Sequence, residues 1–421
     1  MKLTTATLAL TLLALPLQAN ENCSIETLKT AGKAPNPWIN LDNRFSPEHL
    51  RFGLQSNGHF MPRLRIRAKT AVNLLEPASK PLNLANIKAS DPFDQQQRSL
   101  NFLLDSRLYA DGVLVLQNGK VLSESYRNGL GAEQARLLLG ATRPVLSLMG
   151  VMAINQGKLQ PARSVVHHVP ELNQQAAMRK LSIRRLLEGN SQFQWSGAEI
   201  NDWQLAGGWK SGKAGAGMRA WLKQPGRWEK EWIDGNSTLS ETFPEDDLLV
   251  WILNETHRAS LAQIFCEGVL GSFRPEYPAY WLTDQKGTEL SGGLALSLRD
   301  LGRFGQMLVD ARSTSIRTNI PPWFIETLTA SASRGQAAQS GLEGLSKGSE
   351  SRYGFIRLGG APNRIAILGP YGNSLYLDFD RQLVVAIYAS YPGKHGPAML
   401  ATLDQVWSGI SREVQISRGN P

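Results

Sequence analysis

The sequence contains few groups of residues whose types and spacing could carry out chemistry. A serine can act as a nucleophile when a lysine follows three positions later, because both side chains then lie on one face of a helix. No Ser-x-x-Lys occurs anywhere in the 421 residues. A Gly-x-Ser-x-Gly string occurs once, at 344–348 (GLSKG), inside a polar stretch and not between a strand and a helix, and no local cysteine–histidine signature is present. No nucleophile can therefore be recognised by motif.

Metal and phosphate sites are equally poorly represented. The six histidines and two cysteines have no metal-ligand spacing, and the one cluster, His167-His168, lies in an expected loop. We interpret that pair as a surface feature. The run KSGKAGAG at 210–217 resembles a phosphate loop only superficially, because no G-x-x-x-x-G-K-[ST] follows a strand here. The sequence therefore predicts neither a metal nor a cofactor.

The elements that could position a site begin with a hairpin and a helix. A hairpin is predicted over residues 113–126 around Asn118-Gly119, a dipeptide that supplies the two positive φ values of a type I′ turn. A helix is predicted over 145–154, with Pro144 in its first turn and Gly157 beyond its end. Further helices are expected at 182–187 and 297–304, a long polar loop at 313–350, strands at 364–368, 374–378 and 383–389, and a last helix at 397–410.

Strands at both ends of the chain, with helices between them, predict one sheet that an inserted helical region interrupts. We expect an α/β fold of two subdomains, with an antiparallel sheet flanked by helices. The predicted segments are a signal peptide at 1–19, an N-terminal arm at 20–95, a sheet subdomain made of 96–158 and 285–415, and a helical subdomain at 159–284.

Several strings support this architecture by their order and spacing. They are 112–116 (GVLVL), 147–159, 169–172 (VPEL), 181–187 (LSIRRLL), 225–228 (PGRW), 279–284 (AYWLTD), 289–293 (ELSGG), 298–305 and 372–378 (GNSLYLD). Together they resemble the serine β-lactamase-like hydrolases, and within them the aminohexanoate-oligomer hydrolases. The resemblance covers most of residues 100–410. It implies a serine nucleophile, a lysine three residues later, a tyrosine from the helical region and two backbone N–H groups that bind the oxyanion.

This chain departs from that pattern at all three side chains. The register set by 147–159 puts Gly140 at the serine position and Arg143 at the lysine position, and the tyrosine position falls on Trp232. Glycine cannot form an acyl-enzyme, a guanidinium stays protonated and an indole cannot shuttle a proton at neutral pH. We therefore predict a catalytically degenerate member, a pseudoenzyme.

The cleft can still bind a ligand, and two alternatives remain open beside simple drift. In the first, the helix end at Gly140, the Arg143 guanidinium and the backbone N–H of Asn373, next to Gly372, bind the carboxylate of a peptide or cell-wall fragment. In the second, Asp234 neutralises Arg143, Trp232 covers the guanidinium and the site is plugged. The expected ligand-binding set is Gly140, Arg143, Trp232, Asp234, Asn236, Gly372 and Asn373.

Bulk properties give the setting. Residues 1–20 combine a lysine, an apolar run and a small-residue exit, as in a secretory signal peptide, so we expect a periplasmic or secreted protein without a membrane span in the mature chain. The charge of +9 is scattered, which disfavours nucleic acid as a partner. Cys23 and Cys266 are either free or form one disulfide.

Three classes of function follow from these observations. The chain is a pseudoenzyme that binds a ligand or an envelope protein, a serine hydrolase of amides or esters with an unrecognised nucleophile, or a structural envelope protein. For the second class, Ser147 and Ser191 are poor candidates, because Ser147 lies among apolar helix residues and has no base within reach in the sequence.

Overall fold

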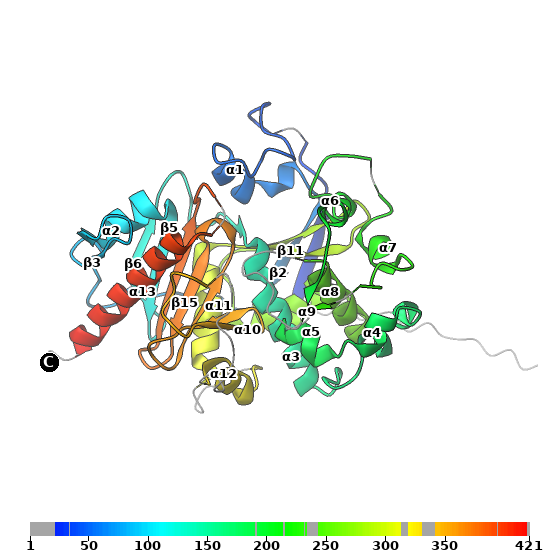
Figure 1. The fold of residues 1–421 in the computed structure, drawn as a ribbon. Coiled ribbons are helices and arrows are strands. Elements are labelled where there is room, and N and C mark those ends of the chain that lie inside the picture. Colours follow the sequence, from blue (N-terminus) through cyan, green and yellow to red (C-terminus); the bar gives the residue numbers. More distant parts are fainter. Residues whose placement is uncertain are drawn as a thin grey trace, which may run out of the picture.

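Two antiparallel sheets organise the chain in the computed structural model (Figure 1). It describes residues 22–32, 34–189, 192–213, 215–230, 232–233, 243–312, 319–330, 342–393 and 395–418. The larger sheet has seven strands in the order β12 (Glu350–Arg352), β13 (Phe355–Arg357), β14 (Arg364–Leu368), β15 (Ser374–Asp378), β16 (Leu383–Ala389), β5 (Ala110–Gln117) and β6 (Lys120–Tyr126). It confirms the predicted sheet built from distant parts of the chain.

Alternation along the strands gives this sheet two apolar faces. On β16, Val384 and Ala386 face the core that includes α11 (Leu298–Asp310), whereas Val385 and Ile387 face α13 (Pro397–Arg418). Successive side chains of a strand point to opposite faces, so one strand serves both cores. The helices predicted at 297–304 and 397–410 therefore lie on opposite faces of the sheet.

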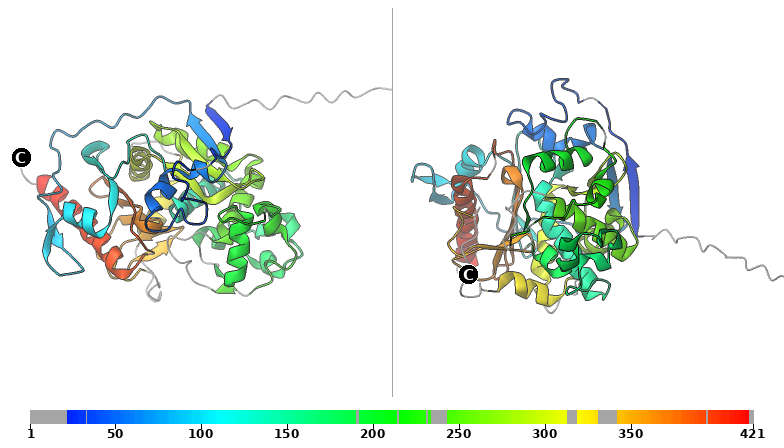
Figure 2. Two further views of the ribbon diagram at one scale, coloured as in Figure 1. Left: turned by 90° about the horizontal axis from the view of Figure 1, so that it is seen from above. Right: turned by 45° about the vertical axis from the view of Figure 1, so that its right-hand side comes forward.

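The second sheet was not predicted. Its order is β1 (Cys23–Leu28), β2 (Arg63–Ala68), β10 (Ala279–Thr283), β11 (Glu289–Leu296) and β7 (Arg136–Leu137). Two of its strands come from the segment expected to be an arm with little periodicity, and they lie beside β10 and β11 in Figure 2. The sequence RLRIRA of β2 alternates arginines with Leu64, Ile66 and Ala68, which is the pattern of a half-buried strand, so the local signal for β2 was present but was missed.

The helical region joins the two sheets. Its elements are α3 (Arg143–Asn155), α4 (Ala176–Lys180), α5 (Ile183–Glu188), α6 (Gly197–Ala206), α7 (Met218–Lys223), α8 (Pro244–His257), α9 (Leu261–Phe265), a π-helical turn η6 (Cys266–Leu270) and α10 (Gly271–Phe273), with a short hairpin of β8 (Gln192–Phe193) and β9 (Trp232–Ile233). The expected loop at 313–350 contains a further helix, α12 (Pro322–Thr329), which corrects that prediction; Phe324, Ile325 and Leu328 are buried and hold it on the core.

The remaining part of the arm bridges the two halves of the molecule. Its helix α1 (Leu50–Gln55) lies at the top of Figure 1, above the gap between β5 and α6. On the helical side, Arg44 donates to the carbonyl of Trp209 at 3.1 Å. On the sheet side, the ring of Phe45 lies 6.1 Å from that of Tyr371. Other short elements include β3 (Lys88–Ser90), β4 (Gln97–Ser99) and α2 (Leu100–Phe102).

A disulfide fixes the start of the described chain. Cys23 on β1 bonds to Cys266, which follows α9, so the alternative of free thiols does not apply. Residues 1–19, the expected signal peptide, lie outside the described residues. Among the helices that are described, none has both the length and the apolar character needed to cross a membrane.

Candidate active-site cleft

The predicted nucleophile position lies in a short 3-10 turn before α3. This turn, η3 (Leu139–Thr142), contains the buried Gly140, and Leu139 before it has a φ of +50°. A non-glycine residue in the left-handed region costs free energy and persists only where its surroundings enforce it. The backbone geometry at the start of α3 is therefore constrained, although Gly140 has no side chain to present.

The sheet side of the site packs directly against η3. The turn η7 (Pro370–Gly372) contacts η3, and a β-carbon on Gly369 would lie 3.0 Å from that of Ala141. The structure thus brings Gly140 close to Gly372 and Asn373, as the sequence predicted for the two oxyanion-binding elements. Both turns are strained, because Tyr371 in η7 also has a positive φ, of +64°.

Asn373 is buried, with 1% of its surface exposed. Its Oδ1 accepts a hydrogen bond from the backbone N–H of Ala389 at 3.2 Å, which directs the side chain toward β16. Among the described residues, neither its Nδ2 nor its backbone N–H has an acceptor. A backbone donor thus remains at the position where the resemblance implies one.

Arg143 points into the protein, between α3, α5 and α8. Its Nε lies 2.8 Å from Oδ1 of Asp246, and each of the two side chains has 9% of its area exposed. Nη1 donates to the hydroxyl of Ser147 at 3.2 Å, and Nη2 donates to the carbonyls of Leu186 and Leu187. All three guanidinium nitrogens therefore have protein partners, and the carboxylate among the described residues that contacts Arg143 is that of Asp246.

Ser147 belongs to the same network. Besides accepting from Arg143, its hydroxyl donates to the carbonyl of Leu187 at 3.2 Å. The residue is fully buried, and none of its described hydrogen-bond partners is a base that could take its proton. The contacts of Ser147 are thus those of a buried structural serine and not those of a nucleophile.

Three consecutive buried carboxyl groups begin α8. Glu245 accepts from the backbone N–H of Phe193 at 2.7 Å and from the indole of Trp195, whereas Asp247 accepts from the indole of Trp203 and the backbone N–H of Ser291, both at 2.8 Å. Burial raises the pKa of both groups to about 7, despite these hydrogen bonds.

The middle carboxyl group, Asp246, differs from its neighbours. Burial also raises its pKa, but Arg143 and the N–H of Phe243 oppose that shift. Arg143 is the cation in direct contact with this helix start, whose unpaired N–H groups also favour negative charge. The pair is thus an internal ion pair that joins α3 to α8.

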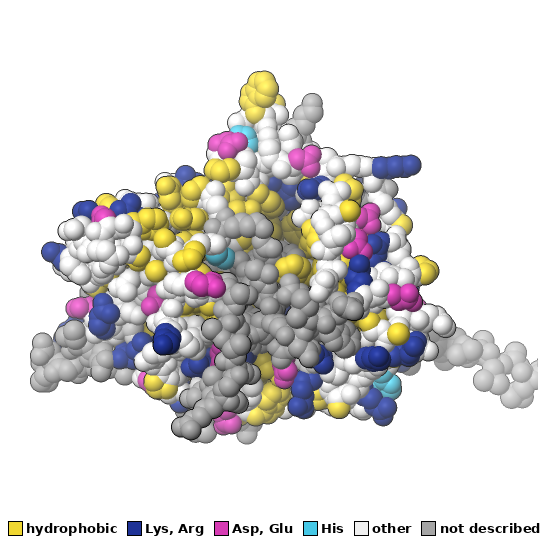
Figure 3. Space-filling view, in the orientation of Figure 1, with side chains coloured by type: hydrophobic (Ala, Val, Ile, Leu, Met, Phe, Trp, Pro, Cys, Tyr) yellow, Lys and Arg dark blue, Asp and Glu magenta, His cyan; other side chains and the backbone are white. Residues whose placement is uncertain are grey.

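The remaining predicted positions are only partly described. Trp232 lies on β9, where its backbone pairs with that of Phe193 on β8. Asp234, Asn236 and Ser191 lie outside the described residues. Figure 3 shows apolar side chains gathered below the arm on this face, beside residues that are not described. Within the described part of the chain, no group of three or more candidate ligands could hold a metal ion.

Comparison with known proteins finds a curated relative of similar sequence. No protein-family model matches the chain. The 6-aminohexanoate-dimer hydrolase of Paenarthrobacter ureafaciens is 22% identical over 366 residues, which cover 84% of this chain and 88% of that protein. The chain is thus similar to this hydrolase over most of both sequences.

Solved structures of β-lactamase-like proteins share the fold. A Bacillus anthracis protein provisionally described as a 6-aminohexanoate-dimer hydrolase superposes with a TM-score of 0.76 at 17% identity, covering 91% of this chain and 98% of that one. An octameric penicillin-binding protein homologue from Pyrococcus abyssi gives a TM-score of 0.51 at 14% identity, covering 72% and 74%. These likenesses confirm the predicted two-subdomain α/β fold.

Sequence reasoning missed the residue that holds Arg143 in this β-lactamase-like chain. Asp246 follows Pro244-Glu245 and precedes Asp247-Leu248-Leu249, so it stands where an acidic run enters an apolar helix. A buried carboxylate needs a cation or several hydrogen bonds. That rule could have identified Asp246 as a candidate partner, although not which arginine it contacts.

Proposed function

We propose that this chain is a non-hydrolysing member of its family, a pseudoenzyme that binds a peptide-like or anionic ligand in the cleft. One observation carries the proposal: the residue at the predicted general-base position, Arg143, is held in a buried ion pair with Asp246. A guanidinium so paired cannot accept a proton. With Gly140 at the predicted nucleophile position, neither the attacking group nor its base is available.

The contacts of Arg143 also refine the proposed ligand site. Because its nitrogens already have protein partners, Arg143 is a positioning residue in this proposal and not a ligand contact. The proposed donors are the backbone N–H of Asn373 and the helix start at Gly140, with Gly372 allowing close approach. Trp232, Asp234 and Asn236 remain the proposed contacts on the opposite wall.

The class of ligand follows from the family. The Paenarthrobacter relative is named for the dimer of 6-aminohexanoate, a linear amide that ends in a carboxylate. A pocket that keeps a backbone donor but loses the nucleophile can bind such an amide without cleaving it. We therefore propose a linear amide or peptide with a free carboxylate, such as a cell-wall fragment, as the ligand; an envelope protein that presents such a segment is the corresponding partner.

The proposed compartment is the periplasm or the exterior. The signal-like residues 1–20 and the Cys23–Cys266 disulfide support export, because disulfides persist in oxidising compartments. A hydrolase that uses an unrecognised nucleophile is the alternative.

Intact-mass analysis after incubation with a reactive penicillin, and separately with a fluorophosphonate, tests the proposal. We expect no adduct on the wild type. Gly140→Ser with Arg143→Lys should also fail, because Asp246 would keep the new lysine protonated. Adding Asp246→Asn and Trp232→Tyr should permit labelling at position 140. An adduct on the wild type would establish a hydrolase and reveal its nucleophile by peptide mapping.

Binding is tested separately by thermal shift with the 6-aminohexanoate dimer. We expect stabilisation of the wild type, which grows with ligand concentration by mass action. The amidated dimer, which lacks the carboxylate, is the control and should stabilise less. If neither compound stabilises the protein, a structural role without a ligand is favoured.

A further inference from the structure

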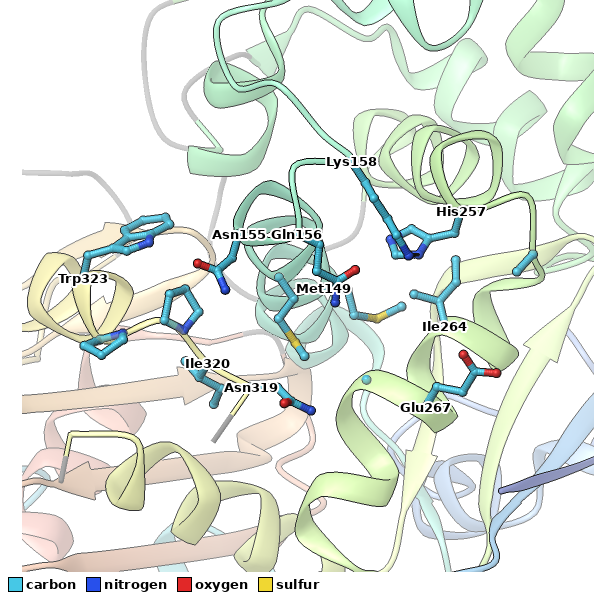
Figure 4. Close-up of a pocket in the computed structure, with 15 residues that line it drawn as sticks. Met149, Asn155, Gln156, Lys158, His257, Ile264, Glu267, Asn319, Ile320 and Trp323 are labelled. Atoms are coloured by element: carbon cyan, nitrogen blue, oxygen red, sulfur yellow. Dashed lines mark hydrogen bonds between the residues drawn. The ribbon is translucent and has the colours of Figure 1, made fainter. Parts of the chain in front are cut away.

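A second pocket lies at the far end of α3. Helix geometry puts Asn155 roughly 20 Å from Gly140, so this pocket is separate from the cleft. It has a volume of about 570 Å³, within the range of ligand sites. Its walls come from the C-terminal end of α3, the end of α8, α9 with η6, and the start of α12 (Figure 4).

The pocket has an apolar floor. Met149, Met152 and Ile264 line it although they are almost completely buried by their neighbours. Trp323, with 39% of its surface exposed, stands on the opposite side from His257 in Figure 4. Methionine side chains adapt to different shapes, so this floor suits an apolar group of variable form.

One wall carries a cation beside a neutral donor. Lys158 Nζ lies 3.4 Å from Nδ1 of His257, and within the described chain Lys158 has no carboxylate partner. Burial, followed by the charge of Lys158, lowers the pKa of His257, so the ring is neutral at pH 7. Because Nδ1 accepts from Lys158, the proton is on Nε2, and that buried atom has no acceptor among the described residues.

The same wall carries an anion. Glu267 also lines the pocket and acts electrostatically on His257 from the side of η6. It accepts a hydrogen bond from Gln263, but a carboxylate has further acceptor sites. Figure 4 shows Lys158, His257 and Glu267 on one side of the pocket, across from Trp323.

This combination selects the charge of a ligand. A simple anion would be attracted by Lys158 but repelled by Glu267, and a simple cation would meet the reverse. A molecule that carries both charges at one end satisfies both side chains, and its apolar remainder can lie over Met149 and Met152. We propose that this pocket binds a free α-amino acid with an apolar side chain, its carboxylate at Lys158 and His257 and its ammonium at Glu267.

Isothermal titration calorimetry with L-leucine, L-methionine and L-phenylalanine tests the proposal on the full chain. At least one of them should bind, whereas its N-acetyl and its amide derivatives should bind at least tenfold more weakly, because each lacks one charge. If the derivatives bind as tightly as the free amino acid, the proposed recognition of both charges is wrong. If none of the three amino acids binds, the proposed amino-acid site is wrong.

Variants locate the binding. Lys158→Gln and Glu267→Gln should each weaken affinity at least tenfold, and Gly268→Leu, which adds a side chain toward Met152 Cε, should abolish it. Lys29→Gln and Glu133→Gln are matched controls at exposed sites away from the pocket and should leave affinity unchanged. Equal affinity in Lys158→Gln, Glu267→Gln and the wild type would overturn the assignment to this wall. Melting temperatures without ligand verify that each variant is folded.

Discussion

Nε of Arg143 and Oδ1 of Asp246 lie 2.8 Å apart in an ion pair that joins the helix after the predicted nucleophile position to a helix far along the chain. Arg143 is the residue that the sequence register puts at the position of a catalytic lysine. A side chain that acts as a general base must be able to lose and gain a proton, whereas a guanidinium in a structural ion pair keeps its proton. Arg143 is in the second situation, because its guanidinium is paired with Asp246.

Removing one member of this pair should destabilise the protein strongly. We expect Asp246→Asn to cost about 3–5 kcal/mol in the free energy of unfolding, because it leaves the Arg143 charge buried without its carboxylate. Urea denaturation measures the loss. Glu171→Gln is the matched control, since the Lys223–Glu171 pair is 3.2 Å long but 43% and 47% exposed, and it should cost no more than about 1 kcal/mol. Equal, small losses in both variants would contradict a structural role for the buried pair.

Glu245 should make the stability fall as the pH rises. Its pKa is raised from 4.5 to about 7 in the folded state, so the folded protein retains a proton that the unfolded chain releases between those pH values. Stability must then decrease across that window and not increase. Glu245→Gln should flatten the decline by up to about 1.4 kcal/mol per pH unit, the limit for one proton. Urea denaturation at pH 5, 6 and 7 tests this, and an unchanged slope would refute it.

Gly53→Ala should loosen the arm. A β-carbon at Gly53 in α1 would lie 1.9 Å from the backbone oxygen of Arg44, and backbone cannot yield as a side chain can. We expect a loss of about 1–3 kcal/mol and faster hydrogen exchange across residues 34–62. Gly131→Ala, where a β-carbon meets nothing within 4 Å, is the control. Unchanged exchange in the arm would show that α1 can shift to accept the methyl group.

Loss of the Cys23–Cys266 disulfide should lower the stability of the protein. The bond joins cysteines 243 positions apart, and a loop of that length contributes about 5 kcal/mol in the chain-entropy model. The variant Cys23→Ala with Cys266→Ala should melt at a lower temperature than the wild type. Dithiothreitol should lower the wild-type melting temperature toward that of the variant and leave the variant unchanged. A wild type and variant that melt together in oxidising buffer would contradict this.

Local signals in the sequence were reliable predictors of the fold. The hairpin at Asn118-Gly119 forms with φ values of +50° and +74° at those residues, and α3 and α11 lie where their apolar patterns predict them. The five-stranded sheet was missed because β2 pairs with β10, whose sequence lies more than two hundred residues away. The alternation of β2 can indicate a strand, but no local pattern encodes its pairing with β10.

The candidate site divides in the same way. The positions Gly140, Arg143 and Asn373 followed from ordered strings, and the structure brings η3 and η7 together. The direction of the Arg143 side chain did not follow, because it depends on Asp246 and on two carbonyls of α5. Position along a sequence can identify a substitution, but the partners of a buried charge depend on packing.

The pairing of β2 with β10 also determines when the five-stranded sheet can form during synthesis. Synthesis delivers β1 and β2 first, and they can pair with each other at once, but β10, the second neighbour of β2, arrives only with residue 279. Until then β2 presents an open edge, which is able to join strands of other molecules. Fragments that end before β10 should therefore aggregate instead of folding, and the newborn chain needs protection during that interval.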